Sequence, residues 1–287
     1  MKTHGSLRYF LLALVLSLSI SFSLAMDRQM VLSVTDGVEY TQWQTDSTGV
    51  IRNISILKID YNRPELTLTV ETAKEKSHEG TTVMAKRANA IAAINGGYFD
   101  FGGSHVGLVY VKDKMIHDQT NNRSAIGFTP DHKVIIDRVD AKDGVIKGLN
   151  GTDWSKVEYA LGGGPVLLQN GQLSAITTES GFGGGFRTTP HPRTAIGVTK
   201  DNTVYLVVVD GRQPGFATGM SLDDLGKFMR DQLGCTDALN LDGGGSSAMV
   251  INNALVNSVS TDAKNGLPGT ERSVTNAIAL VQKEPVK

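Results

Sequence analysis

A short apolar segment that begins with arginine recurs along this chain and constrains its fold more than any other feature. Arg123-Ser124-Ala125-Ile126-Gly127-Phe128-Thr129 returns as Arg193-Thr194-Ala195-Ile196-Gly197-Val198-Thr199, and a weaker copy starts at Arg272. A glycine cluster precedes each copy, at Asn95-Gly96-Gly97, Gly162-Gly163-Gly164 and Asp242-Gly243-Gly244. Such self-similarity predicts three related β-rich units whose glycine turns face a shared centre. The alternative is a chance match between common strand patterns.

The pattern of apolar residues between these clusters predicts mostly strands. Alternating β-branched residues predict strands over Val50–Asp60 and Leu66–Thr72. Turn residues between apolar runs predict hairpins at Lys112-Asp113, Asn170-Gly171 and Asn252-Asn253. Helices are expected over residues 83–89, capped by Thr81-Thr82, and over residues 222–233, capped by Ser221. The predicted class is α+β: β-rich, with several hairpins, three related Gly-turn/strand units and a few helices packed on the sheets.

The first 25 residues are typical of a secretory signal peptide. Lys2 and Arg8 form a basic start, residues 10–20 are apolar, and Ser23-Leu24-Ala25 resembles a cleavage site. We therefore expect an exported protein, periplasmic or secreted, with no membrane span after cleavage; the alternative is an uncleaved N-terminal anchor. The expected organisation is a signal peptide at 1–25, an N-terminal β-rich segment at 26–80 packed on the main domain, and a catalytic domain at 81–287.

The net charge argues against a nucleic-acid partner, and the cysteine content argues against a disulfide and a Cys/His zinc site. Loss of residues 1–25 removes two of the 28 basic residues and none of the 29 acidic ones, which leaves a net charge of about −3. Nucleic-acid-binding proteins usually carry a basic face, so no nucleic-acid partner is expected. Cys235 is the only cysteine, so no intramolecular disulfide can form, and the six scattered histidines do not suggest a Cys/His zinc site.

The segment Leu239–Val250 places one carboxylate between two apolar runs. Asp242 ends the first run, three glycines follow, and Ser246-Ser247 precede the second run. Successive glycine N–H groups can form an anion-binding nest, and a carboxylate beside it can act on a negatively charged substrate. The plainer interpretation is a tight turn between two strands. Asp210 also follows an apolar strand and precedes glycine, which predicts a second carboxylate at a sheet edge.

Other polar stretches share this arrangement of glycine, acid and arginine beside strands. They are Ile94–Asp100, Leu161–Val166, His191–Gly197, Val208–Arg212 and Glu271–Asn276. In this order, together with the Asp242 segment, they resemble the phosphodiester glycosidase family, and the resemblance extends from about Ala90 to Val281. No single motif is specific to that family, but the ordered set is. The resemblance implies removal of a sugar, with N-acetylglucosamine as one candidate, from a sugar-1-phosphodiester.

Cleavage of such a bond requires charge stabilisation at the phosphate and a carboxylate near the anomeric carbon. The candidate catalytic groups are Asp242, Asp210 and Glu271. Arg193 and Arg272 are candidate phosphate ligands, because one guanidinium can bind two oxygens at once. The other substrate-binding candidates are Asn95, Gly243, Gly244, Ser246, Ser247 and Asn276. The plainer alternatives are turn caps for the carboxylates and structural ion pairs for the arginines. A divalent cation held by Asp and Asn oxygens is a further option, without assigned ligands.

The predicted site brings distant residues together. Asn95, Arg193, Asp210, Asp242 and Arg272 should line one pocket, with the two arginines close enough to share a phosphate. The predicted function is an exported glycosidase that hydrolyses sugar-1-phosphodiesters, as small molecules or in glycans, by C–O cleavage. Two alternatives stay open: a non-catalytic glycan-binding protein of the cell envelope, and a phosphodiesterase that cuts the P–O bond.

Overall fold

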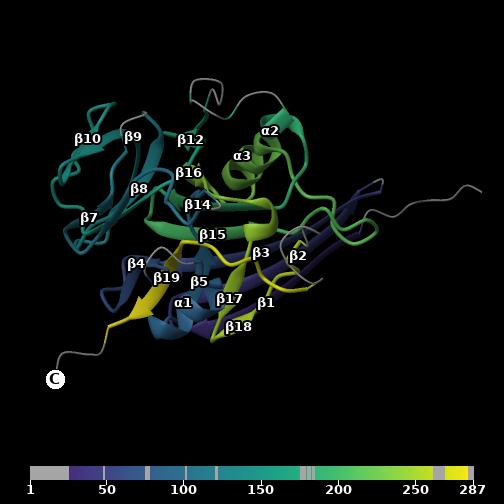
Figure 1. Cartoon of the computed structure of the whole chain (residues 1–287). Helices are drawn as coiled ribbons and strands as arrows, with labels where there is room; N and C mark the ends of the chain where they lie inside the picture. The colour runs from purple at the N-terminus through teal and green to yellow at the C-terminus, as the bar shows by residue number, and fades with distance from the viewer. Residues whose placement is uncertain are drawn as a thin grey trace, which may run out of the picture.

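Three antiparallel sheets with helices on their outer faces make up the protein, in a computed structural model of the chain (Figure 1). The structure describes residues 26–47, 49–74, 78–100, 102–119, 122–174, 179, 182, 185–260 and 269–283. The predicted signal peptide, residues 1–25, lies outside the described residues. The predicted β-rich α+β class is confirmed.

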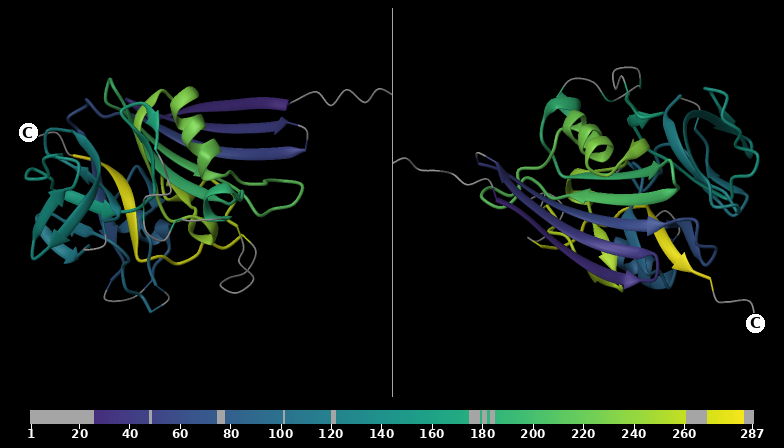
Figure 2. Two further views of the ribbon diagram at one scale, coloured as in Figure 1. Left: turned by 90° about the horizontal axis from the view of Figure 1, so that it is seen from above. Right: turned by 180° about the vertical axis from the view of Figure 1, so that it is seen from behind.

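The largest sheet has eight strands and contains the N-terminal strands of the described chain. Its order is β1 (Met26–Thr35), β2 (Val38–Ser47), β3 (Val50–Asp60), β15 (Thr203–Val209), β14 (Arg193–Thr199), β16 (Cys235–Asn240), β12 (Val166–Gln169) and β13 (Gln172–Leu173). The purple strands β1 to β3 project beyond the other strands of the sheet (Figure 2). Because β3 pairs with β15 from residue 54 to residue 60, the N-terminal strands continue the main sheet.

The two smaller sheets complete the β structure. The five-stranded sheet runs β18 (Ala254–Leu255), β17 (Met249–Ile251), β5 (Ala92–Asn95), β19 (Asn276–Gln282), β4 (Leu66–Thr72). The six-stranded sheet runs β10 (Val145–Gly148), β9 (Val134–Lys142), β8 (Ser124–Phe128), β11 (Tyr159–Gly162), β6 (Val109–Val111), β7 (Lys114–His117). The predicted bounds of β3 and β4 match the structure.

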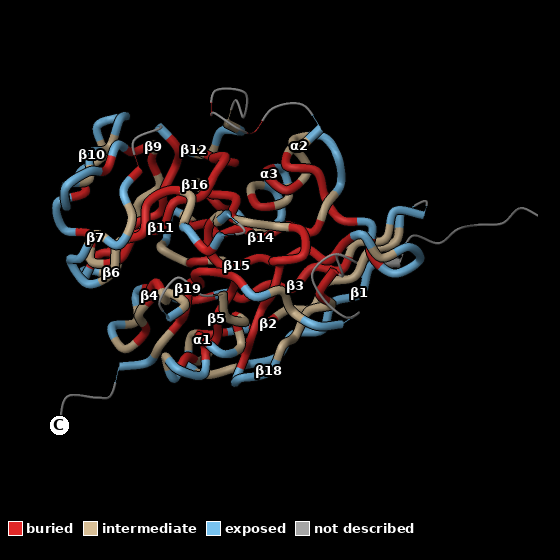
Figure 3. The backbone as a smooth tube through the Cα atoms, viewed as in Figure 1, coloured by how far each residue is buried: buried red, intermediate tan, exposed pale blue. Residues whose placement is uncertain are grey.

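The main hydrophobic core lies where the three sheets meet. Figure 3 shows the buried backbone concentrated there and the exposed backbone at the periphery. Leu57 and Leu239 enter this core from the eight-stranded sheet, Leu68 and Ile94 from the five-stranded sheet, and Ile126 from the six-stranded sheet. All five are fully buried, and burying each such side chain contributes about 1.5–3 kcal/mol. The core therefore fixes the three sheets relative to one another.

The two predicted helices are α1 (Thr81–Arg87) and α3 (Leu222–Asp231). A short helix, α2 (Gly185–Thr188), lies next to α3. α3 begins as predicted, because the Ser221 hydroxyl accepts a hydrogen bond of 3.1 Å from the Asp224 N–H. The predicted threonine cap of α1 is wrong: its N-cap is Gly80, which makes no side-chain hydrogen bond there. The Glu271 carboxylate, from a distant loop, instead accepts the Thr82 N–H at 3.3 Å.

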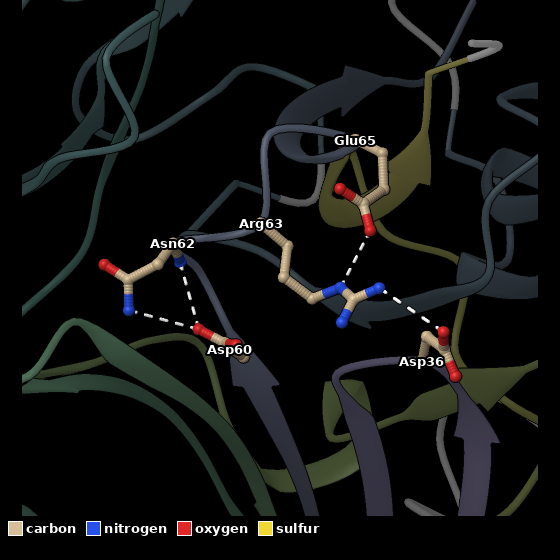
Figure 4. A network of polar contacts seen from close by, with 5 residues as sticks. All are labelled: Asp36, Asp60, Asn62, Arg63 and Glu65. Atoms are coloured by element: carbon tan, nitrogen blue, oxygen red, sulfur yellow. Dashed lines mark hydrogen bonds and ion pairs between the residues drawn. The ribbon is translucent and has the colours of Figure 1, made fainter.

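Three hairpin turns have the backbone conformation that their sequences predict. Both residues of each predicted two-residue turn, Lys112-Asp113, Asn170-Gly171 and Asn252-Asn253, have positive φ. Such turns match the right-handed twist of a hairpin, so the three hairpin predictions are confirmed. Where the chain leaves the eight-stranded sheet after β3, a network of polar contacts holds the turn (Figure 4). There Arg63 binds Glu65 at 2.7 Å and Asp36 at 3.4 Å.

The predicted three-unit repeat is present as three strand pairs with one common register. Ala125 lies opposite Gly162, Ala195 opposite Asn240, and Ala277 opposite Asn95. The next backbone hydrogen bond is the same in each pair, since Gly163, Leu241 and Gly96 donate to the carbonyls of Ser124, Thr194 and Asn276. The third copy is therefore aligned on Thr275-Asn276-Ala277, and Arg272 lies three residues before the position of Arg123 and Arg193.

The three glycine turns meet at one centre, as the sequence predicts. The Gly164 N–H donates to Asn240 O at 2.7 Å, which joins the second turn to the third. The Asp242 N–H donates to Gly96 O at 3.1 Å, which joins the third turn to the first. The first turn contacts the second so closely that a Cβ on Gly97 would lie 2.1 Å from Gly162 O. Each glycine strand also pairs with an arginine-type strand from another part of the chain.

Gly97→Ala is expected to destabilise the protein by about 1–3 kcal/mol, because the added methyl group cannot fit against the backbone of the second turn. Urea unfolding would measure the loss. Gly185→Ala is the matched control, since the nearest atom to its added Cβ lies at an ordinary contact distance of 3.4 Å. Equal stability of the two variants would contradict the close packing of the turns.

Candidate active site

The candidate site is built on the loop between β16 and β17, which carries Asp242. This loop leaves β16 at the meeting point of the three turns, and its backbone then forms a short 3-10 turn, η2 (Gly244–Ser246). Gly243 passes so close to the backbone that an added Cβ would lie 2.7 Å from Pro192 O. Gly244 has φ +64, in the left-handed region that glycine adopts without steric cost. Glycine is thus required by the backbone path of this loop.

Asp242 is a half-buried carboxylate surrounded by donors and cations. Its side chain accepts the Gly243 N–H at 2.9 Å and is hydrogen-bonded to Ser246. Burial raises the pKa of Asp242 to about 6, against the opposing effect of these hydrogen bonds and of the charges of Arg272 and Arg212. A carboxyl with a pKa near neutrality can exchange a proton or carry a charge at working pH, which suits acid–base or nucleophilic chemistry.

Two arginines from separate loops flank the glycine turn. A Cβ on Gly244 would lie 3.1 Å from Arg212 Nη1, and a Cβ on Gly245 would lie 2.5 Å from Arg272 Nη2. Arg272 also donates to the Ser246 hydroxyl at 3.4 Å. The two positive charges act on one another, since Arg212 contributes to lowering the pKa of Arg272. Two guanidinium groups beside a glycine turn form a suitable site for a phosphate group.

Arg212 adopts an unusual backbone conformation. Its φ is +58, although bulky residues rarely enter the left-handed region. Such a conformation costs on the order of 1 kcal/mol and is retained where the surrounding structure fixes it, often at functional sites. The turn before it is tight, because a Cβ on Gly211 would lie 2.8 Å from Gly219 Cα. The exposed Arg212 side chain is thereby directed to the glycine turn.

Arg193 is part of the framework beneath the site and does not extend to the glycine turn as Arg272 does. It is 2% exposed and donates to three carbonyls, those of Met220, Phe186 and Thr189, at 2.7–3.0 Å. The Phe186 ring covers its guanidinium at 4.9 Å. Burial lowers the pKa of Arg193 to about 10. The expected sharing of one phosphate by Arg193 and Arg272 stays a prediction, and the two arginines described above as flanking the glycine turn are Arg212 and Arg272.

The predicted asparagines and serines hold the loops in place. Asn95 donates to Asp242 O at 2.7 Å, and its side-chain oxygen accepts from Thr194 at 2.7 Å and from the Ala248 N–H at 3.1 Å. Asn276 accepts the Gly97 N–H at 2.6 Å. Ser247 is buried, and its hydroxyl lies 3.2 Å from that of Thr194. These groups are 1% exposed or less, so they position Asp242 from within the protein.

Asp210 lies in a neighbouring polar cluster behind the glycine loop. It is 3% exposed, and its carboxylate accepts from the Asn257 side chain at 3.0 Å and from the Ser258 N–H at 3.2 Å. Asn257 also donates to Ser247 O at 3.2 Å, which connects Asp210 to the loop that carries Asp242. Burial raises the pKa of Asp210 to about 6 despite these two hydrogen bonds.

Asp210 should make the stability of the protein depend on pH. Because the folded pKa exceeds the ordinary value of 3.8, the folded state holds this proton more tightly than the unfolded state. The resulting stabilisation is complete below about pH 4 and is lost as the pH rises through about 6. Relative to Asp210→Asn, the wild type should lose about 1–3 kcal/mol between pH 4 and pH 7, measured by urea unfolding. A constant difference across this range would contradict the raised pKa.

Glu271 and His191 lie beside the site, where each contacts a neighbouring segment of the protein. Glu271 packs against the first turn of α1, where a Cβ on Gly80 would lie 2.2 Å from its Oε1. It thus fixes the start of the loop that carries Arg272. His191 pairs through its backbone with Met220, and burial with the charges of Arg212 and Arg193 lowers its pKa.

Among the residues that the structure describes, no three or more His, Cys, Asp or Glu side chains gather where they could hold a metal ion. None of the described helices has the length and apolar character needed to cross a membrane.

Most of this chain matches a known protein family. Residues 88–281 match the sequence model of the phosphodiester glycosidase family, a span that includes every loop of the site described above. The chain belongs to the phosphodiester glycosidase family. The resemblance seen in the ordered motifs is therefore confirmed.

The curated relatives of this chain are distant. A prophage-derived uncharacterised protein of Bacillus subtilis, YomE, is 27% identical over 215 residues, which cover 71% of this chain and 30% of the relative. The human N-acetylglucosamine-1-phosphodiester α-N-acetylglucosaminidase is 24% identical over 206 residues, which cover 68% of this chain and 38% of the relative. The chain thus spans less than two fifths of the length of these relatives.

A solved structure shows that the fold is shared. The catalytic domain of the zebrafish N-acetylglucosamine-1-phosphodiester α-N-acetylglucosaminidase, auto-inhibited by its pro-peptide, aligns with a TM-score of 0.67 and 21% identity. The alignment covers 91% of this chain and 83% of that chain. At this identity the likeness concerns the arrangement of the sheets.

Three residues of the candidate site were not predicted from the sequence. Arg212 ends the motif Val208–Arg212, and its position two residues after Asp210 could have identified it as a candidate. Tyr98 follows the first glycine pair; its hydroxyl donates to Gly164 O at 2.8 Å and accepts from Asn240 at 2.9 Å, which ties all three turns together. Asn257 lies in an ordinary loop sequence, and only the fold reveals its contact with Asp210.

Proposed function

We propose that this member of the phosphodiester glycosidase family is an exported hydrolase that removes a sugar, such as N-acetylglucosamine, from a sugar-1-phosphodiester by C–O cleavage. The observation that carries the proposal is the position of Asp242 beside two guanidinium groups on a glycine turn. A phosphodiester carries negative charge on the leaving side of the scissile bond, and positive charge develops at the anomeric carbon. The two guanidinium groups suit the negative charge, and the Asp242 carboxylate suits the positive charge.

The two arginines bind the phosphodiester oxygens. As the bond from the anomeric carbon to the bridging oxygen breaks, its electron pair leaves with the phosphate, which becomes a monoester with an additional negative charge. Arg212 and Arg272 stabilise that charge, and the half-buried Arg272 does so where water screens less. Because phosphate is a better leaving group than a sugar alcohol, the reaction depends less on a general acid.

Asp242 serves the sugar side of the bond. Its carboxylate stabilises the positive charge at the anomeric carbon, as a nucleophile or as a base for the attacking water. Water then contributes its oxygen to the sugar and its proton to the medium. Asn95 and Ser246 hold Asp242 through its backbone and its carboxylate. Asp210 supports the loop through Asn257 and is a positioning residue in this scheme.

The position of an isotope label tests this function against its two alternatives. The protein would be incubated with N-acetylglucosamine-1-phosphodiesters of small alcohols in ¹⁸O-labelled water, and both products would be analysed by mass spectrometry. Label in the sugar supports C–O cleavage. Label in the phosphate would identify a phosphodiesterase, and the absence of turnover on a panel of sugars would identify a non-catalytic binding protein.

Export is tested separately. The basic, apolar and small-residue order of residues 1–25 supports cleavage after Ala25. Mass spectrometry of the protein recovered outside the cytoplasm should find a chain that starts at or near Met26. An intact Met1 in that material would contradict cleavage.

A further inference from the structure

A crevice separate from the candidate active site lies between α3 and the strands β2 and β3. Its volume is about 240 Å³, and its lining includes Trp43 and Thr45 of β2, Arg52 and Ile54 of β3, and Phe228 of α3. Asp210 faces away from it, because the preceding residue, Val209, packs on the α3 side of the sheet and successive side chains alternate between faces. None of Asp242, Arg212 and Arg272 lines the crevice either, so it is a separate site.

Aromatic rings form one wall of this crevice. Trp43 from β2 and Phe228 from α3 lie with their ring centroids 5.3 Å apart and their planes at 57°. Both side chains are half-buried, so part of each ring faces the crevice. The Trp43 Nε1–H is held by Asp27 at 2.5 Å, which fixes the orientation of the indole. Fixed aromatic surfaces of this kind bind the apolar faces of ring-shaped ligands.

Arg52 lines the crevice with a guanidinium group. Its Nη2 lies 3.6 Å from the Asp224 carboxylate, which is beyond hydrogen-bond distance. Its Nε is buried and closed to the crevice, but the side chain as a whole is 31% exposed. A ligand oxygen in the crevice would therefore bind the exposed part of the guanidinium, through a hydrogen bond strengthened by its charge.

The remaining lining selects an uncharged polar ligand. Asp224 and Asp231 supply two negative charges, Arg52 and Lys227 supply two positive charges, and Gln232 supplies an amide. This balance disfavours an anion or a cation and suits a ligand with many hydroxyl groups, which both donate and accept. A cavity of about 150 Å³ admits a benzene ring, so 240 Å³ admits one larger six-membered ring with substituents.

We propose that this crevice binds one uncharged pyranose unit of a glycan chain. The ring packs against Trp43 and Phe228, and its hydroxyls accept from Arg52 and donate to Asp224. This second site goes beyond the proposed function, because it requires no turnover and no phosphate. It gives the protein a means of attachment to glycan at a distance from Asp242.

Binding would be measured with neutral tetrasaccharides of N-acetylglucosamine, glucose and mannose, each free of phosphate. Trp43 is one of only two tryptophans, and the other, Trp154, is buried in the six-stranded sheet, so tryptophan fluorescence reports on the crevice. At least one tetrasaccharide should change the fluorescence in a saturable manner at concentrations up to about 10 mM. Trp43→Phe should abolish this change, and calorimetry should confirm the affinity.

Matched variants assign the binding to the crevice. Arg52→Met should weaken binding at least about tenfold, because it removes a charged donor. Arg63→Met is the control: its side chain is 34% exposed, against 31% for Arg52, and it also lies beside carboxylates. Phe228→Ala should weaken binding as well, which keeps the test decisive if Arg52→Met does not fold. Asp242→Asn should leave binding unchanged.

The outcomes separate this inference from the proposed catalysis. Unchanged binding in both Arg52→Met and Phe228→Ala, or the absence of saturable binding by all three tetrasaccharides, would overturn the inference. Saturable binding of inorganic phosphate at the crevice would overturn the choice of an uncharged ligand. Hydrolysis of small sugar-1-phosphodiesters by Arg52→Met and Phe228→Ala should stay at the wild-type rate. Failure of this hydrolysis in the wild type would count against the catalytic proposal alone.

Discussion

Asp242→Asn is expected to lower kcat/KM for a sugar-1-phosphodiester at least about a hundredfold, with little change in stability. The exchange preserves the shape of the side chain but removes the negative charge that the proposed reaction requires at the anomeric carbon. A hundredfold loss corresponds to about 3 kcal/mol of transition-state stabilisation. Steady-state kinetics and thermal unfolding would be measured on the same preparation.

The matched control is Asp237→Asn, at an aspartate in β16 whose carboxylate accepts the Asn170 N–H at 3.0 Å on the exposed surface. It should retain wild-type activity. Near-normal turnover of Asp242→Asn would assign Asp242 to the turn alone. Loss of activity together with a large loss of stability would mean that its carboxylate holds the glycine loop and performs no chemistry.

The variants Arg193→Met and Arg272→Met are expected to fail in different ways. Arg193→Met removes the donor of three carbonyls, one in a buried and two in partly buried hydrogen bonds, and should cost about 3–5 kcal/mol of stability. Arg272→Met should leave most of the stability intact, since this side chain is half-buried, and should lower kcat/KM about a hundredfold through loss of a phosphate ligand. Urea unfolding and steady-state kinetics would distinguish them.

The opposite pattern would contradict the site as described. If Arg193→Met remained stable and lost activity, Arg193 would contact the substrate. If Arg272→Met unfolded, its role would be structural. Arg212→Met provides an independent check, because Arg212 is exposed and should behave as Arg272 does.

Local patterns predicted much of this fold from the sequence. β3 and β4 follow from alternation of apolar residues, and the three hairpins follow from turn residues that tolerate positive φ. The start of α3 follows from Ser221, whose cap is made within three residues. The cap of α1 could not be predicted in this way, because Glu271 reaches it from 189 residues away along the chain.

The sequence predicted which loops come together at the site. It was less informative about the role of each residue in those loops. The repeat indicated that the glycine turns converge, and the registers of the three strand pairs bear this out. The repeat also suggested equal roles for Arg193 and Arg272. Their environments differ because Arg193 starts its strand, whereas Arg272 lies in the loop four residues before β19. Burial decides which arginine contacts a ligand, and burial of a polar residue depends on distant segments.

The pairing of each glycine strand with a distant arginine-type strand affects the order in which the chain can gain activity during synthesis. Asn95 finds its partner strand only when Ala277 has been made, and that pairing holds one of the three turns at the centre of the site. Contacts between such remote segments slow folding, because the entropy of a long loop must be lost before they form. A ribosome-bound chain that ends before β19 already contains Arg272, but it has no strand to hold Asn95 through this pairing. The growing protein therefore cannot complete the centre where the three turns meet until β19 emerges.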